Sequence, residues 1–333
     1  MKHTLPLLAA LSIIGSQALN AQAPAAPPAT EAPKAPKAAR PAPPPGPPPT
    51  MANVSYGPDE SQVMDFYKAE SAKPTPLLFF IHGGGWVAGS KANPGELKDC
   101  LAAGISVVSI EYRFIQKAIL AGQKPPVEWP LHDAARALQF VRSKAGEWNI
   151  DKERIGASGG SAGACSSLWL AFHPDMADPK STDPIAREST RLWCAAVNGA
   201  QTSLDPKELK EWTPNSRYGG HAFGLMDPNN LRDRDTHFAE FLEKRETFLP
   251  WIKEYSPIEH VSKDDPSVGL YYTVAPSIGE PQKDPTHTAN YGVKLQEKCK
   301  AIGVDCELVY PGAPDVKHKS IALYLIDKLK AAK

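Results

Sequence analysis

The chain has 333 residues, of which 42% are hydrophobic and 22% charged, and 37 basic residues balance 37 acidic ones. A net charge of zero, without a basic stripe interleaved with aromatic residues, argues against a nucleic-acid-binding protein. The length accommodates one large α/β domain or two smaller domains.

The first 21 residues have the pattern of a secretory signal peptide. Residues 1–3 are a short basic start, residues 5–14 are apolar, and small residues follow over 18–23. The apolar run is shorter than the roughly 20 residues that a membrane-spanning helix needs. We therefore expect a secreted or periplasmic protein that keeps no membrane span after signal cleavage.

A segment of Pro and Ala with a few basic residues occupies positions 22–50. It has little to bury and many fixed φ angles, so it is expected to be a disordered, extended spacer. Such a segment either tethers the export signal to the working domain or binds a proline-recognising partner. We favour the tether and expect the folded domain to span 51–333.

Apolar runs of strand length alternate with helical patterns from residue 51 onward, and we expect strands over 76–82, 104–113, 154–158, 193–200, 268–275 and 305–311. Near-continuous apolar runs of this kind are typical of parallel strands buried on both faces. Helices are expected over 131–145 and 291–302. The alternation predicts an α/β fold with a mostly parallel central sheet flanked by helices. An alternating segment from residue 62 predicts an antiparallel edge strand.

The alternation breaks down over residues 201–257, which we expect to form a cap or lid over the carboxyl edge of the sheet. Substrate selectivity is expected to reside there. Its aromatic side chains either line a substrate pocket or form the core of the cap itself. They include Trp212, Tyr218, Phe223 and Phe238.

The segment RIGASGGSAGA matches the pattern GxSxG twice, centred on Ser158 and on Ser161. A nucleophile elbow needs small residues two positions to either side of its serine and a helix directly after it. Gly159 and Gly163 flank Ser161, and the helical sequence ACSSLWLAF follows. A helix after Ser158 would begin through two glycines, each costing about 1 kcal/mol relative to Ala. Ser161 is therefore the predicted nucleophile, and Ser158 the last residue of a strand.

A glycine run, IHGGGWVAGS, directly follows the first strand of the predicted parallel sheet. The backbone N–H groups of Gly84 and Gly85 are predicted to form an oxyanion hole with that of Ala162. The helix that begins at Ala162 would point its positive end at Ser161. We expect His82 to shape this loop through hydrogen bonds rather than to act as an acid or base.

Four segments together resemble the α/β-hydrolase superfamily, above all esterases related to hormone-sensitive lipase and small carbohydrate-directed esterases with an HGGGW loop. They are FFIHGGGWVAGSK, EYR, WPLHDAARALQFVRSKAGEWNIDKERIGASGGSAGA and YSPIEHVSKDDPSVGLYY. The resemblance covers residue 51 to the C-terminus. It implies an α/β-hydrolase fold and carboxylic ester hydrolysis through an acyl-enzyme, with a Ser-Asp-His triad in that chain order and no metal or organic cofactor. In such relatives the serine lies six residues after the isoleucine of the RI strand, which again selects Ser161.

The resemblance also directs the search for the acid and the base. Asp284 stands between the fifth predicted strand of the parallel set and the next helix, as the acid of the family does, and Glu280 is the alternative. Of the nine histidines, His318 alone follows the last predicted strand. It lies three residues beyond Asp315, where the family has its histidine. We predict a triad of Ser161, Asp284 and His318, with His287 as the other candidate base.

The substrate implied by the resemblance is a small-molecule or carbohydrate ester, with acetylated or feruloylated polysaccharide as an example. The displaced histidine keeps a second hypothesis open, in which a degenerate hydrolase serves as a binding or scaffold protein. A peptidase on the same fold is a third hypothesis. The sequence leaves the oligomeric state open.

Five cysteines in an exported chain leave at least one thiol unpaired. Cys299 and Cys306 either close a small disulfide loop or stay free. The other cysteines lie in apolar surroundings that favour buried, unreactive thiols, and no cysteine pair has zinc-like spacing. These others are Cys100, Cys165 and Cys194.

Overall fold

A computed structural model of the protein describes residues 46–331. The predicted signal peptide over 1–21, and the linker as far as residue 45, lie outside the described residues. Among the described residues no helix combines the length and the apolar character that crossing a bilayer requires.

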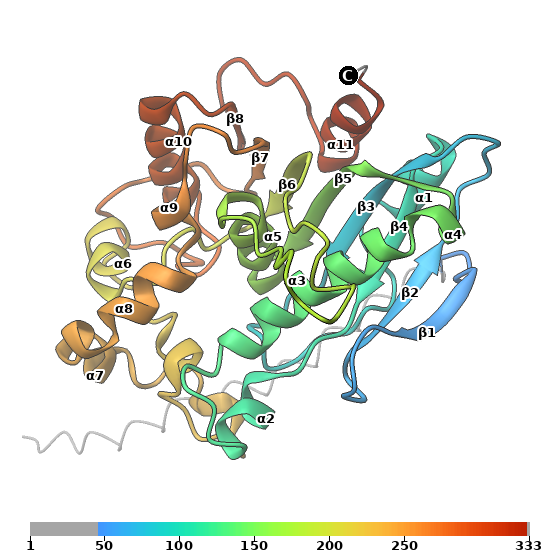
Figure 1. The fold of residues 1–333 in the computed structure, drawn as a ribbon. Coiled ribbons are helices and arrows are strands. Elements are labelled where there is room, and N and C mark those ends of the chain that lie inside the picture. The colour runs from blue at the N-terminus through green and yellow to red at the C-terminus, as the bar shows by residue number, and fades with distance from the viewer. Residues whose placement is uncertain (1–45, 332–333) are drawn as a thin grey trace, which may run out of the picture. The chain divides into compact units, whose positions relative to one another are not determined.

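An eight-stranded sheet forms the centre of the domain, in the strand order β1-β2-β4-β3-β5-β6-β7-β8 (Figure 1). Strands β3 to β8 are mutually parallel, and β2 pairs antiparallel with both β1 and β4. The bounds are β1 Met51–Ser55, β2 Val63–Tyr67, β3 Thr75–Ile81, β4 Ser106–Ile110, β5 Ile150–Gly160, β6 Cys194–Asn198, β7 Ser267–Tyr271 and β8 Cys306–Val309. Every predicted parallel strand is thus confirmed. The predicted antiparallel strand, β2, is not at the edge, because β1 covers it.

Helices connect the strands and cover both faces of the sheet (Figure 1). Their bounds are α1 Leu97–Ala102, α2 Ile115–Leu120, α3 Glu128–Ser143, α4 Ala145–Trp148, α5 Ala162–Phe172, α6 Pro206–Trp212, α7 Phe238–Glu243, α8 Arg245–Tyr255, α9 Pro257–His260, α10 Asn290–Ile302 and α11 Ile321–Lys330. Two short 3-10 helices, η1 Gly220–Phe223 and η2 Leu231–Asp233, precede α7. The predicted helices at 131–145 and 291–302 correspond to α3 and α10.

Two hydrophobic cores lie on the two faces of the sheet. Side chains of successive strand residues alternate in direction, so Leu77 and Phe79 of β3 join the core of α3, α5 and α10. Leu78 joins the smaller core of α1 and α11. The strands are therefore buried on both sides, which explains why their sequences are apolar without alternation.

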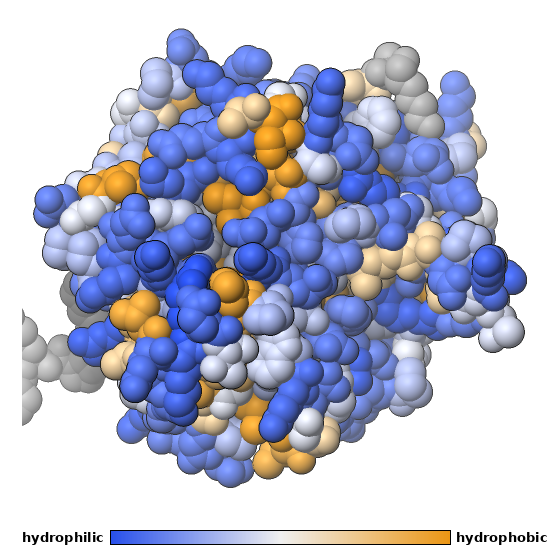
Figure 2. Space-filling view, turned by 60° about the vertical axis from the view of Figure 1, so that its left-hand side comes forward, coloured by the Kyte–Doolittle hydropathy of each residue, from blue (hydrophilic) through white to orange (hydrophobic). Residues whose placement is uncertain are grey.

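The connection between β6 and β7 holds α6 to α9 and both 3-10 helices, and includes the predicted cap region 201–257. Its aromatic residues pack into the protein core. Phe223 and Phe238 contact the ring of Phe241, Trp212 contacts Tyr291 of α10, and Tyr218 lies beside Trp86 of the glycine loop. Figure 2 brings the left-hand side of Figure 1 forward and shows a mostly hydrophilic face with small apolar patches.

Candidate active site

The turn between β5 and α5 places Ser161 at the carboxyl edge of the sheet. Ser161 has φ 54° and ψ −122°, a backbone conformation that few non-glycine residues adopt. A side chain on Gly159 or on Gly163 would collide with the carbonyl oxygen of Ile81 in β3. Only glycine fits at both positions, so these two residues allow the tight turn that exposes Ser161.

Ser158, the competing serine, belongs to the strand. It is 1% exposed and lies two residues before the end of β5 rather than at its last residue. Its Oγ donates to Oε2 of Glu96 at 3.4 Å, and burial raises the pKa of Glu96 to about 7. Ser158 is therefore engaged with the segment that leads into α1, away from the turn.

A histidine and an aspartate from the loop between β7 and α10 complete a hydrogen-bonded chain with Ser161. Nε2 of His287 lies 2.9 Å from Oγ of Ser161. Nδ1 of the same ring lies 2.8 Å from Oδ2 of Asp284. The other carboxylate oxygen of Asp284 accepts the backbone N–H groups of Thr286 and His287, each at 3.2 Å. The carboxylate is thus held by its own loop and orients the imidazole toward the serine.

The electrostatic environment favours the ionised form of Asp284. Partial burial by itself raises its pKa, but the hydrogen bond and the charge of His287, with the two backbone N–H groups, lower the pKa overall below its ordinary value. An ionised acceptor is what a neighbouring imidazole needs in order to carry a proton during a reaction.

His318 does not reach Ser161, and the prediction that it approaches the serine is wrong. Its Nδ1 lies 2.7 Å from Oε2 of Glu307 in β8, and its Nε2 lies 3.3 Å from Oδ2 of Asp327 in α11. Both ring nitrogens are therefore occupied by carboxylates. His287 takes the place beside the serine and still gives the chain order Ser, Asp, His.

Glu280, the alternative acid, is exposed. Its carboxylate makes no hydrogen bond to a histidine within residues 46–331. The informative signal in the sequence was the spacing Asp284-x-x-His287. It places acid and base on one loop, where a local turn brings them together.

The glycine run passes directly beside the nucleophile. A Cβ on Gly83 would lie 3.4 Å from the Cβ of Ser161. Gly84 and Gly85 have φ of 103° and 63°, in the region that favours glycine. In the described part of the chain, the N–H groups of Gly84, Gly85 and Ala162 donate to no protein acceptor. Their assignment to an oxyanion hole stays a prediction that this arrangement favours.

The sequence model of one protein family, BD-FAE, matches residues 64–273, which is more than half of the chain. The chain belongs to the BD-FAE family. The match includes the glycine loop and the elbow with Ser161, and it ends before Asp284 and His287. The acid and the base of this BD-FAE protein therefore lie beyond the matched residues.

Individual relatives and structures agree with this assignment. Esterase LipC of Mycobacterium tuberculosis is 32% identical over 64% of this chain and 48% of its own length. Gut esterase 1 of Caenorhabditis elegans is 31% identical over 46% of this chain and 29% of its own. The chain thus spans less than half of either relative. A truncated carbohydrate esterase from gut microbiota superposes with a TM-score of 0.59 at 19% identity, covering 84% of this chain and 96% of the other. This likeness shows the α/β-hydrolase fold.

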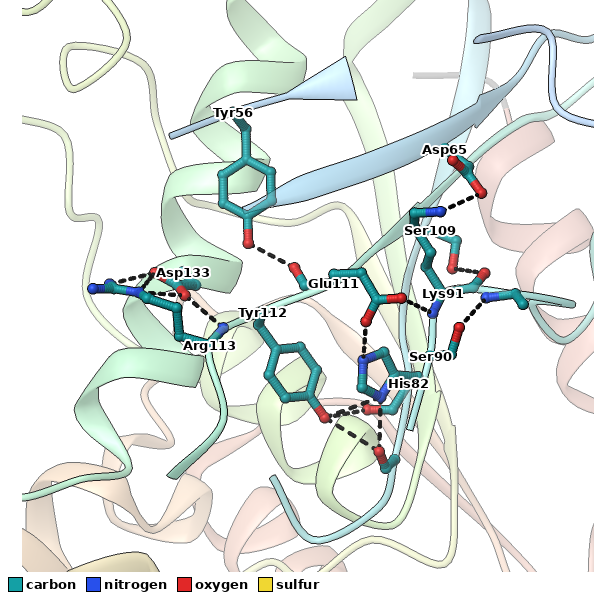
Figure 3. A network of polar contacts seen from close by, with 12 residues as sticks. Tyr56, Asp65, His82, Ser90, Lys91, Ser109, Glu111, Tyr112, Arg113 and Asp133 are labelled. Carbon is teal, nitrogen blue, oxygen red and sulfur yellow. Dashed lines mark hydrogen bonds and ion pairs between the residues drawn. The ribbon is translucent and has the colours of Figure 1, made fainter. Parts of the chain in front are cut away.

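A buried polar network holds the glycine loop of this BD-FAE protein in place (Figure 3). Nε2 of His82 lies 3.1 Å from Oε2 of Glu111, and the other oxygen of Glu111 accepts the N–H of Lys91 at 2.9 Å. The hydroxyl of Tyr112 donates to the carbonyl of His82 at 2.9 Å. His82 directly precedes the three glycines. The hydrogen bonds of its ring and of its carbonyl hold it in place, which confirms its predicted role in shaping the loop.

A partly buried ion pair lies next to this network (Figure 3). Nη2 of Arg113 lies 2.6 Å from Oδ1 of Asp133, whose side chain is 2% exposed. The backbone N–H of Arg113 also donates to Asp133, at 2.9 Å. The pair fixes the segment after β4 to α3. Both residues lie in segments that carry the family resemblance, EYR and WPLHDAARALQFVRSKAGEWNIDKERIGASGGSAGA, but the sequence assigned neither of them a role.

The cysteines are free thiols. Cys100, Cys165 and Cys194 are buried, as predicted. Burial raises the pKa of both Cys100 and Cys194 to about 12 and that of Cys165 further still, which disfavours the reactive thiolate. Cys299 and Cys306 are not joined in the structure. A hydrogen bond from one thiol to the other, together with burial, raises the pKa of Cys306.

Proposed function

We propose that this BD-FAE protein hydrolyses carboxylic esters through an acyl-enzyme, with Ser161 as nucleophile, His287 as general base and Asp284 as the residue that orients the base. The observation that carries the proposal is the continuous hydrogen-bonded chain from Oγ of Ser161 through His287 to Asp284. A serine hydroxyl becomes nucleophilic when an adjacent base removes its proton and a carboxylate stabilises the resulting imidazolium.

The reaction follows from these contacts. Oγ of Ser161 attacks the ester carbonyl while its proton passes to Nε2 of His287. The carbonyl oxygen becomes an oxyanion, which the N–H groups of Gly84, Gly85 and Ala162 stabilise. The intermediate collapses, the C–O bond to the alcohol breaks, and His287 gives its proton to the departing alcohol. Water then attacks the acyl-enzyme by the same route, which releases the carboxylic acid and restores Ser161.

Within the same proposal, the substrate is an acyl ester on carbohydrate and the protein is exported to the periplasm or beyond the cell. The likeness to the carbohydrate esterase from gut microbiota supports the substrate class, and the signal-like pattern of residues 1–21 supports export. Residues 201–257, between β6 and β7, are the proposed lid. Arg234 in this segment reaches the glycine loop, since its Nη1 would lie 2.6 Å from a Cβ on Gly85.

The two other hypotheses have less support. A degenerate, purely binding hydrolase was suggested by the displaced histidine, but His287 stands within hydrogen-bonding distance of Ser161. No feature of residues 46–331 favours a peptidase over an esterase.

A burst assay of the full chain with p-nitrophenyl acetate and p-nitrophenyl butyrate tests the proposal. We expect a stoichiometric burst of p-nitrophenol, because acylation releases the alcohol before water attacks. Ser161→Ala is expected to abolish the burst, whereas Ser158→Ala, the matched control on the neighbouring serine, is expected to retain it. Wild-type turnover of every ester by Ser161→Ala would refute the proposal. Release of acetate from acetylated xylan, compared between the same variants, tests the substrate class separately.

A further inference from the structure

Three side chains of metal-ligating types, from three different segments of the chain, lie together at the end of α5. His173 follows α5, Glu254 lies in α8 and His260 ends α9. One ligating atom from each residue lies within 4.8 Å of the others. Nε2 of His173 is 3.1 Å from Oε1 of Glu254. This cluster lies outside the proposed catalytic site.

Each imidazole of the cluster is anchored through one of its two ring nitrogens. Nδ1 of His173 lies 2.8 Å from the carbonyl oxygen of Pro174, and Nε2 of His260 lies 2.6 Å from that of Glu254. A carbonyl only accepts hydrogen bonds, so the anchoring nitrogens carry the protons. In the neutral rings, Nε2 of His173 and Nδ1 of His260 then have free lone pairs. Histidine ligands of metals are typically oriented in this way by a carbonyl on their second nitrogen.

The contact between His173 and Glu254 needs a cation. With Nδ1 of His173 protonated, a neutral ring directs a lone pair at a carboxylate oxygen, so two acceptors would face each other. A second proton or a metal ion resolves this conflict. In tetrahedral zinc sites, metal–ligand bonds of about 2.1 Å set neighbouring ligand atoms about 3.4 Å apart, close to the separation of these two atoms.

The backbone beneath the cluster is fixed. The carbonyl oxygen of Glu254 accepts from Nε1 of Trp169 at 2.8 Å as well as from His260. The Trp169 ring lies 4.5 Å from the His173 ring, centroid to centroid. The Glu254 side chain is 43% exposed, whereas that of His173 is 16% exposed. The cluster thus rests on a hydrogen-bonded backbone carbonyl and a tryptophan ring, and its carboxylate is partly exposed to water.

We propose that His173, Glu254 and His260 bind one zinc ion, with water completing its coordination. Two imidazoles and a carboxylate form a donor set that zinc prefers. The ion would join the end of α5 to α8 and α9, the last helices before β7. Because Ser161 directly precedes α5 and His173 directly follows it, the ion lies about 18 Å along the helix axis from Ser161. The ion therefore stabilises the fold and takes no part in ester cleavage, and the inference is independent of the proposed function.

Calorimetric titration of the EDTA-treated and dialysed full chain with zinc chloride tests the site. We expect one zinc ion per chain and a melting temperature that rises when zinc is added. His173→Ala, His260→Ala and Glu254→Gln are each expected to weaken binding at least tenfold. Glu254→Gln keeps the backbone carbonyl that anchors His260, so it removes the ligand charge with little risk to the fold.

Two control variants distinguish this site from other histidine–carboxylate groups. His237→Ala removes an imidazole that lies within 3.2 Å of both Asp233 and Glu240, and His287→Ala removes the imidazole beside Ser161. Both variants are expected to bind zinc as the wild type does. Absence of stoichiometric binding to the wild type would overturn the proposal. So would binding that persists in His173→Ala and Glu254→Gln but disappears in either control.

Discussion

The loops that follow β7 and β8 each hold a histidine against a carboxylate, and only the first of them serves Ser161. In the β7 loop, His287 and Asp284 are 2.8 Å apart. In the β8 pair, Nδ1 of His318, in the loop after β8, lies 2.7 Å from Oε2 of Glu307 in the strand itself. The two pairs differ in the partner of the second ring nitrogen, which is Ser161 for His287 and Asp327 for His318. A histidine–carboxylate pair therefore does not by itself distinguish the two loops, whereas the third partner of each histidine does.

The two pairs also differ in how far their side chains are exposed to solvent. The side chains of His287 and Asp284 are 39% and 59% exposed, whereas those of His318 and Glu307 are 16% and 12% exposed. A base must be accessible to substrate and water, but a structural ion pair gains from the lower dielectric of a buried position. The β8 pair thus joins β8 to the segment that leads into α11, and the β7 pair lies beside Ser161.

Removing one carboxylate charge from each pair is expected to have very different effects on kcat/KM. Asp284→Asn should lower kcat/KM by about 10³-fold or more, because the imidazolium loses its counter-charge and its orienting acceptor. Glu307→Gln, the matched change in the β8 pair, should leave kcat/KM within about threefold of the wild type. Steady-state kinetics on p-nitrophenyl butyrate measures both. Equal losses in the two variants would mean that the loops do not divide catalysis and structure in this way.

Stability should show the reverse order. His318→Ala leaves the half-buried Glu307 without its imidazole partner and is expected to cost about 1–3 kcal/mol in the free energy of unfolding. His287→Ala removes a more exposed side chain and should change stability by less than about 1 kcal/mol. Urea denaturation followed by circular dichroism gives both values. A larger loss for His287→Ala would contradict the structural role of the β8 pair.

The smallest effect concerns the titration of Asp284. Its pKa lies below the ordinary value of 3.8 in the folded protein. The ionised carboxylate therefore stabilises the folded state at pH values above 3.8, and this contribution is lost as the pH falls through the pKa of the folded state. In His287→Ala the pKa of Asp284 should rise toward its ordinary value, because the side-chain hydrogen bond is gone. Carbon-13 NMR of labelled aspartate carboxyls measures the shift, and His318→Ala serves as the control in which Asp284 should titrate unchanged.

The sequence predicts the central part of this molecule well. Continuous apolar runs identify the parallel strands, because burial on both faces leaves no other composition. The small residues around Ser161 identify the elbow, because the Ile81 carbonyl excludes any Cβ there. By contrast, β1 carries no such signal, since its residues are exposed or half-buried at the edge of the sheet.

The sequence ranks His287, the histidine beside Ser161, second to His318 for a physical reason of another kind. Family analogy placed it after β8, and His318 was the histidine available there. Whether a loop histidine reaches a serine 126 residues away in sequence depends on backbone turns that no pattern of residue types specifies. The short spacing from Asp284 to His287 was visible, but only the fold shows that this loop lies against Gly199 and Ser161.

The most direct test of the account compares the acylation burst of His287→Ala with that of His318→Ala, at one pH and on p-nitrophenyl acetate. The account predicts that His287→Ala loses the burst and at least about 10⁴-fold in kcat/KM, whereas His318→Ala keeps a wild-type burst. Loss of the burst in His318→Ala, together with near-normal acylation by His287→Ala, would contradict the assignment of His287 as the base.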